Sequence, residues 1–176
     1  MLHWTTPRLI LRPWCADDAA PFAAMSADAE VMRFFPSTLS APEAAALVAG
    51  ENALFADQGL GVLPVTLRDT GAFLGCVGLH PIRSNLPLEP GVEIVWRLAR
   101  SAWGQGYAPE AARAWLDYGF STLKLAEVVA FTAEINLPSQ AVMRKLGMRR
   151  SPDKDFDHPA LPEGDRLRPH VVYVAP

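Results

Sequence analysis

The fold is decided by one stretch of the sequence, Val92-Glu-Ile-Val-Trp-Arg-Leu-Ala-Arg-Ser-Ala-Trp-Gly-Gln-Gly-Tyr-Ala-Pro-Glu-Ala-Ala112. Its apolar beginning, 92–98, predicts a strand, and Gly104 and Gly106 predict a turn, because glycine accepts positive φ and lets the backbone approach a ligand. Pro109 places a helix start directly behind, since proline there gives up only an N–H that no helix carbonyl needs. The stretch therefore predicts a strand, a turn and a helix whose N-terminus can stabilise an anion such as a phosphate.

Two common nucleotide motifs do not fit this glycine turn. A dinucleotide fingerprint needs the turn after the first strand and a third glycine, whereas this turn lies past the middle of the chain and has Pro109 at the third position. A Walker loop needs Gly-Lys-Ser/Thr, which is missing here. A Gly-x-Gly turn can also be a tight packing corner, so both a phosphate site and a packing corner stay open at this point.

Patterning outside this stretch predicts a mixed α/β chain. Alternating apolar residues predict strands at 8–12, 63–68, 73–80, 92–98, 127–133 and 171–174. Caps and helical spacing predict helices at 17–25, 41–57, 109–124 and 137–146, with a further short helix at 28–35. The proline-containing loop 81–90 is expected to contact substrate, and the segment 151–169 is expected to form an ordered loop or lid.

Composition excludes several classes of protein. The 176 residues fit one domain, 1–176, and 16 Lys plus Arg against 19 Asp plus Glu give a net charge of −3, so nucleic acid is not expected as a partner. Cys15 and Cys76 lie outside any metal-ligand spacing, so no metal is expected and both are interpreted as structural. The chain has neither a leader pattern nor an apolar run of about 20 residues, which predicts a cytoplasmic protein without a membrane partner.

Two runs of sequence, 96–111 and 131–148, resemble the cofactor-binding half of GNAT acetyltransferases, and the branch they resemble is that of the ribosomal-protein N-terminal acetyltransferases. The opening 6–13 and the tail segments 156–159 and 170–173 resemble the same branch, so the resemblance covers nearly the whole chain. It implies an α/β (α+β) fold: a single domain with a mixed, mostly antiparallel sheet, a V-shaped split at its centre and helices on both faces.

The resemblance also implies acetyl-CoA as the cofactor. The pantetheine arm would bond the backbone of the strand at Trp96 and Leu98, and the pyrophosphate would lie on the turn. Trp103 departs from the pattern, because many members carry Gln or Arg there, and Arg100 is the candidate replacement donor. The cofactor-binding residues that the resemblance implies are Trp96, Leu98, Arg100, Trp103, Gly104, Gln105, Gly106, Tyr107, Ala108, Asn136 and Ser139.

Acyl transfer to an amine needs a base for the amine and a proton for the leaving thiolate. Glu93 is the candidate base; the alternative is an ion pair with an arginine on the sheet. Many members of the family place a tyrosine acid at the position occupied here by Leu146, which excludes that route. Ser139 is the candidate donor, and a plain helix-start hydroxyl is the alternative.

The acceptor is less defined by the sequence. Phe35, Ser37 and His158 are the candidate acceptor-binding residues, against ordinary packing for the first two and a backbone-bonded loop histidine for the third. The predicted function is acetyl transfer by direct attack to a primary amine, either a protein N-terminus or a small molecule. The alternative is a catalytically silent acyl-CoA-binding or regulatory domain. A roomy, solvent-open groove would favour a peptide acceptor, whereas a closed acidic pocket under 81–90 would favour a polyamine or aminoglycoside. Monomer and homodimer both stay open.

Overall fold

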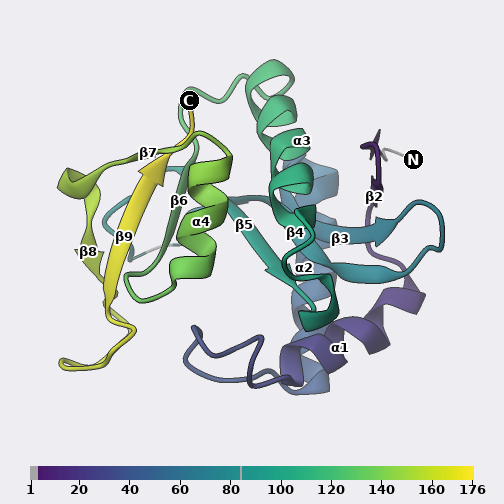
Figure 1. The fold of residues 1–176 in the computed structure, drawn as a ribbon, viewed down its shortest axis with the longest axis horizontal. Coiled ribbons are helices and arrows are strands. Elements are labelled where there is room, and N and C mark those ends of the chain that lie inside the picture. The colour runs from purple at the N-terminus through teal and green to yellow at the C-terminus, as the bar shows by residue number, and fades with distance from the viewer. Residues whose placement is uncertain (1–3, 84) are drawn as a thin grey trace.

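One mixed sheet organises the chain in the computed structural model, which describes residues 4–83 and 85–176 (Figure 1). All strand pairs of the described residues are antiparallel except β5 with β6. The order across the sheet is β1 (Trp4–Thr5), β2 (Leu9–Leu11), β3 (Gly61–Leu67), β4 (Phe73–Pro81), β5 (Val92–Leu98), β6 (Val129–Ala133), β9 (Pro169–Val174) and β7 (Arg149–Arg150), with β8 (Phe156–Asp157) also paired to β9.

The sheet is split at its centre. β5 and β6 pair in parallel at one register only, Glu93 with Val129, and then diverge. On its other side β5 pairs with β4 over its full length, from Pro81 with Val92 to Gly75 with Leu98. The last residues of β5 therefore present an unpaired backbone edge towards β6, and the expected V-shaped split is confirmed.

Helices cover both faces of the sheet. In Figure 1, α3 (Tyr107–Ser121) and α4 (Leu137–Lys145) lie in front of the sheet and α2 (Ala41–Gln58) lies behind it, with α1 (Ala19–Ala27) packed on α2 and β4. α2 begins with reciprocal bonds between Ser40 and Glu43 and ends at Gly59, which has a φ of 70°. The capping box is the start signal and the left-handed glycine is the stop signal that the sequence predicted for this helix.

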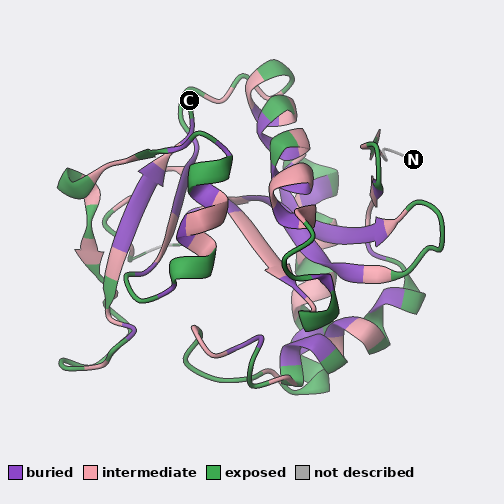
Figure 2. Cartoon of the chain, in the orientation of Figure 1, coloured by how far each residue is buried: buried purple, intermediate pink, exposed green. Residues whose placement is uncertain are grey.

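The core lies between the sheet and these helices, where the buried residues of Figure 2 concentrate. Trp115 of α3 is fully buried and meets Trp4 edge-on at 4.8 Å between ring centroids. β3 and β4 approach so closely that a Cβ added at Gly78 would lie 1.8 Å from the Gly61 carbonyl oxygen. Close packing of this kind fixes the register of the strands that carry the site.

One predicted element is wrong. The segment 28–35 forms turns and not a helix. The Asp28 side chain accepts a bond from the Glu30 N–H, and Pro36 disfavours helical backbone at Phe35. The other predicted helices and strands are present with ends shifted by a few residues, whereas the two-residue strands β1, β7 and β8 were not predicted.

The structure also bears on membrane spans, metal sites and the two cysteines. No helix of the described chain is long and apolar enough to cross a membrane. In residues 4–83 and 85–176, no group of three or more His, Cys, Asp or Glu side chains is placed to hold a metal ion. Cys15 is exposed, and burial raises the pKa of the Cys76 thiol to about 11, so this thiol stays protonated near neutral pH. The predicted single domain spans 1–176, of which 1–3 and 84 lie outside the described residues.

Candidate functional site

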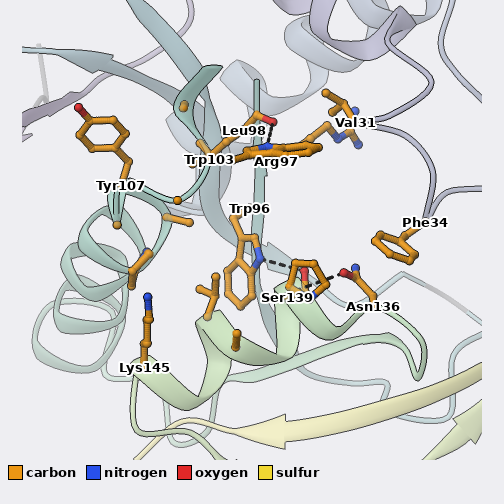
Figure 3. A pocket seen from close by; sticks show the side chains of 18 of the residues that line it. Val31, Phe34, Trp96, Arg97, Leu98, Trp103, Tyr107, Asn136, Ser139 and Lys145 are labelled. Carbon is orange, nitrogen blue, oxygen red and sulfur yellow. Dashed lines mark hydrogen bonds between the residues drawn. The ribbon is translucent and has the colours of Figure 1, made fainter. Parts of the chain in front are cut away.

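A cavity of about 310 Å³ opens at the split (Figure 3). It is bounded by the end of β5, the turn before α3, one face of α4 and the segment 31–35. Its lining residues are Val31, Arg33, Phe34, Phe35, Trp96, Arg97, Leu98, Ala102, Trp103, Gly104, Gly106, Tyr107, Ala108, Pro109, Asn136, Pro138, Ser139, Ala141, Val142 and Lys145.

The turn before α3 forms one wall of this cavity. Gly104 and Gly106 have φ values of 74° and 80°, a left-handed conformation that favours glycine. No acceptor among the described residues takes the backbone N–H groups of Gly104, Gly106, Tyr107 or Ala108. A Cβ at Gly104 would meet no atom within 4 Å, so the turn is open to a ligand and is not a packing corner. Free amides at a helix N-terminus form an anion site.

Arg8, which directly precedes β2, and its neighbour Thr6 hold this turn in place. Arg8 donates to the Gln105 carbonyl at 2.9 Å and forms an ion pair of 2.6 Å with Glu110 of α3. The Thr6 hydroxyl donates to the same carboxylate. Burial alone would raise the pKa of Glu110, but the bonds from Thr6 and Arg8 outweigh burial and hold that pKa below its usual value. The carboxylate is therefore ionised at neutral pH and anchors the start of α3 to the sheet.

The unpaired edge of β5 forms the second wall. The Ala99 N–H donates to Leu74 on β4, so by strand alternation the backbone groups of Trp96 and Leu98 point into the split. The Trp103 indole donates to the Leu98 carbonyl at 2.8 Å, as Figure 3 shows. The groups left free for a ligand are therefore the Leu98 N–H and both backbone groups of Trp96.

The start of α4 forms the third wall. The Asn136 side chain accepts from the Ser139 N–H at 3.3 Å, and the Trp96 indole donates to the Ser139 hydroxyl oxygen at 3.2 Å. Because this oxygen acts as an acceptor, the Ser139 O–H remains free to donate to another group. The bonds fix both side chains at the mouth of the split (Figure 3).

The charged side chains of the lining are all cations. Arg33, Arg97 and Lys145 line the cavity, and none of the described lining residues is an Asp or Glu. Arg33 lies over the Trp103 ring, with its guanidinium carbon 4.8 Å from the centroid. Three cations and a helix N-terminus together favour an anionic ligand.

Glu93 lies on β5 outside this lining, at the register where β5 and β6 pair. Burial raises the pKa of its carboxyl group to about 7; the nearby Arg83 opposes the rise and the nearby Glu51 adds to it. No arginine of the described residues forms an ion pair with Glu93, so the sheet ion pair considered as its alternative is not formed. Its role as base remains a prediction.

Most of the residues predicted to bind cofactor come together in the cavity. Those that line it are Trp96, Leu98, Trp103, Gly104, Gly106, Tyr107, Ala108, Asn136 and Ser139. Gln105 belongs to the turn but does not line the cavity: its carbonyl accepts from Arg8, and its side-chain amide donates to the Ser101 carbonyl. The structure does not bring Arg100 to the cavity, because its side chain is 60% exposed and lies 3.9 Å from Asp28. The cations that do line the cavity are Arg33, Arg97 and Lys145.

The residues predicted to bind the acceptor are spread out. Phe35 lines the cavity, whereas Ser37 is exposed outside it. The His158 ring accepts from the Ala160 N–H and lies 5.0 Å from the His170 ring, between centroids. His158 thus forms the backbone hydrogen bond expected of an ordinary loop histidine, which was the alternative to acceptor binding.

Sequence reasoning missed several lining positions, among them Arg33, Arg97, Val142 and Lys145. The last two lie three residues apart on the face of α4 that also carries Ser139, so helical spacing from Ser139 could have found them. Arg97 could have been noticed as a charged residue within an apolar strand. The turns that place Arg33 carry no such signal.

A split sheet, a glycine turn with free amides and an adjoining cavity together define an acetyltransferase type of α/β domain. The chain belongs to the GNAT acetyltransferase family, since the acetyltransferase (GNAT) domain model matches residues 8–149. The uncharacterized N-acetyltransferase YnaD of Bacillus subtilis (strain 168) is 30% identical over 173 residues, which is 98% of this chain and 96% of that protein.

Solved structures show the same fold. An acetyltransferase from Agrobacterium tumefaciens str. C58 has a TM-score of 0.79 and 27% identity, covering 100% of this chain and 95% of that one. A ribosomal-protein-S5-alanine acetyltransferase from Vibrio fischeri has a TM-score of 0.78, covering 99% of this chain and 96% of that one. At 15% identity the second likeness is one of fold alone.

Proposed function

We propose that this chain transfers the acetyl group of acetyl-CoA to a primary amine, by direct attack of the amine. One observation carries the proposal: a single cavity joins the free amides before α3 to the unpaired edge of β5. Amides at a helix N-terminus suit a pyrophosphate, and an open strand edge suits a chain that carries amide groups.

The residues of the chain fit this cofactor by their chemistry. Gly104, Gly106 and the amides behind them would hold the phosphates, with Lys145 as an added cation. Trp96 and Leu98 would bond the pantetheine arm. Bound there, the cofactor supplies an activated acetyl thioester.

Proton transfer is assigned to two side chains. Glu93 takes the proton of the attacking amine, directly or through water, and its pKa of about 7 suits a base that works near neutral pH. Ser139 donates to the departing thiolate sulfur through its free O–H. Leu146 is 1% exposed and apolar, so no proton comes from that position.

The cofactor half of the proposal is tested by titrating acetyl-CoA into the protein in a calorimeter. Gly106→Glu places bulk and negative charge in the turn and is expected to abolish binding. Gly164→Glu is the matched control, because Gly164 also has a positive φ of 82° and no atom within 4 Å of its added Cβ. Absence of binding to the unchanged protein, or equal loss in both variants, would overturn the assignment.

The transfer half is tested by following thiol release from acetyl-CoA with a panel of primary amines and short peptides. Release that depends on an added amine supports acetyl transfer. Tight binding of acetyl-CoA without turnover of any amine would favour the second candidate, a silent acyl-CoA-binding domain.

A further inference from the structure

Arg97 lies on the face of β5 that looks away from α4. Trp96 bonds Ser139 of α4, so strand alternation turns Glu93, Val95 and Arg97 to the opposite face. The register with β4 agrees, because Arg97 pairs with Cys76 and Glu93 pairs with His80. Arg97 also lines the cavity, so the cavity includes a residue from this face of β5.

No described residue forms an ion pair with the guanidinium of Arg97. Its Nε and Nη1 atoms are buried without a hydrogen bond in the described structure. The guanidinium lies over the Phe35 ring, with the guanidinium carbon 4.5 Å from the ring centroid. The other buried unpaired side-chain atoms of the described chain belong to neutral groups, on Trp4, Ser26 and Trp115. An arginine presents a planar fork that matches a carboxylate, and buried guanidinium nitrogens without an acceptor are unfavourable until one binds.

Charges of opposite sign lie at the two ends of this face. Arg97 lies four positions after Glu93, which is roughly 13 Å between Cα atoms along a strand. Glu51 of α2 lies at the Glu93 end and contacts His80 at 3.6 Å. Arg83 is also near Glu93, so that end carries two carboxylates, one arginine and a histidine, whereas Arg97 lies against the Phe35 ring and pairs across the sheet with Cys76. A ligand with an amine at one end and an anion at the other complements this arrangement.

We propose that Arg97 binds a carboxylate on the acceptor, so that the acceptor is a small primary amine carrying a carboxyl group, of the amino-acid class. The inference rests on the proposed acetyl transfer and narrows its acceptor. A polyamine or an aminoglycoside does not suit the cavity that Arg97 lines, because a polycation would meet an arginine without an acceptor there. The acidic pocket under the loop 81–90, with Glu89, Glu127, Asp153 and Asp155, is a separate pocket that Arg97 does not line. The transfer itself balances without a further reactant: the N–C bond forms, the C–S bond breaks, and one proton passes from nitrogen to the thiolate.

The first test compares three acceptors that share one side chain: phenylalanine, phenylalaninamide and 2-phenylethylamine. The measured quantity is the ratio of kcat/KM for phenylalanine to kcat/KM for each of the two amines without a carboxylate. Because the three amines differ in basicity, this ratio is compared between protein variants, where those differences cancel. Arg97→Gln is expected to lower this ratio about 10- to 100-fold, mainly through KM, with partial recovery in Arg97→Lys. Arg149→Gln removes the same charge from the exposed strand β7 and is expected to leave the ratio unchanged.

The second test does not need turnover. N-acetylphenylalanine and its amide are titrated into the protein saturated with coenzyme A. The free acid is expected to bind more tightly than the amide, and Arg97→Gln is expected to remove the difference. Arg97→Met is expected to raise the melting temperature of the free protein, because it replaces an unpaired buried charge by an apolar side chain.

The outcomes separate the two proposals. Acetylation of amines without any Arg97-dependent preference for a carboxylate would sink the inference and leave acetyl transfer standing. Weaker acetyl-CoA binding by Arg97→Gln, with the acceptor ratio unchanged, would make Arg97 a cofactor contact and equally overturn the inference. Absence of acetyl-CoA binding would instead remove the proposed function.

Discussion

Replacing Glu93 by Gln should make the stability of the protein depend less on pH. The pKa of the Glu93 carboxyl is raised from 4.5 to about 7, mainly by burial. The folded chain therefore holds this proton more tightly than the unfolded chain does. Stability is lost as the pH rises from 4.5 to about 7, because the unfolded chain releases the proton in that window while the folded chain retains it. Above pH 7 the loss is complete.

The size of the effect follows from the shift. At 1.36 kcal/mol per pKa unit, the ionised carboxylate costs up to about 3 kcal/mol at pH 8 and almost nothing at pH 4.5. Glu93→Gln removes this cost, so its free energy of unfolding relative to the unchanged protein should rise by up to about 3 kcal/mol between these two pH values.

The assay is urea unfolding of both proteins at pH 4.5, 6 and 8, followed by tryptophan fluorescence. Glu163→Gln is the control, because Glu163 is an exposed carboxyl in a loop. A stability difference for Glu93→Gln that stays constant with pH would refute the reasoning, since it would mean that the carboxyl titrates alike in the folded and unfolded chains.

Two further predictions concern the turn and the sheet. Glu110→Gln, which removes the carboxylate that bonds Thr6 and Arg8, should weaken acetyl-CoA binding several-fold in calorimetry without abolishing it; unchanged affinity would show that the turn holds itself. Gly78→Ala should lower the free energy of unfolding by more than about 3 kcal/mol, and with it the melting temperature, because its Cβ would lie 1.8 Å from a backbone oxygen. Gly50→Ala in α2, with open space around its Cβ, should instead stabilise by about 0.5–1 kcal/mol, and similar melting temperatures for the two variants would contradict the packing argument.

Local patterns in the sequence predicted the elements that depend on neighbouring residues. The box of Ser40 and Glu43 gives the start of α2, and the alternation of 92–98 gives β5 with the bounds that the structure has. The glycines 104 and 106 predicted the turn, since positive φ is a property of single residues. The segment 28–35 was misjudged because its cap, Asp28, turns the backbone locally and no periodic apolar face continues from it.

Contacts between distant parts of the chain were out of reach. Arg8 and Glu110 are 102 residues apart, and their ion pair depends on where α3 crosses the sheet. The raised pKa of Glu93 depends on burial that exists only in the folded chain. That Nε and Nη1 of Arg97 lack a hydrogen-bond partner likewise follows from the folded cavity, because a sequence does not show which acceptors surround a side chain.

The single register between β5 and β6 means that the sheet keeps an open edge inside the molecule. Edges at the rim of a sheet can recruit a strand from another chain, but this one is flanked by α3, α4 and the Trp103 indole. Only a slender, extended molecule with its own amide groups can complete the ladder there. A chain that folds in this way leaves part of its secondary structure to be supplied by its ligand, so its stability should follow the concentration of that ligand.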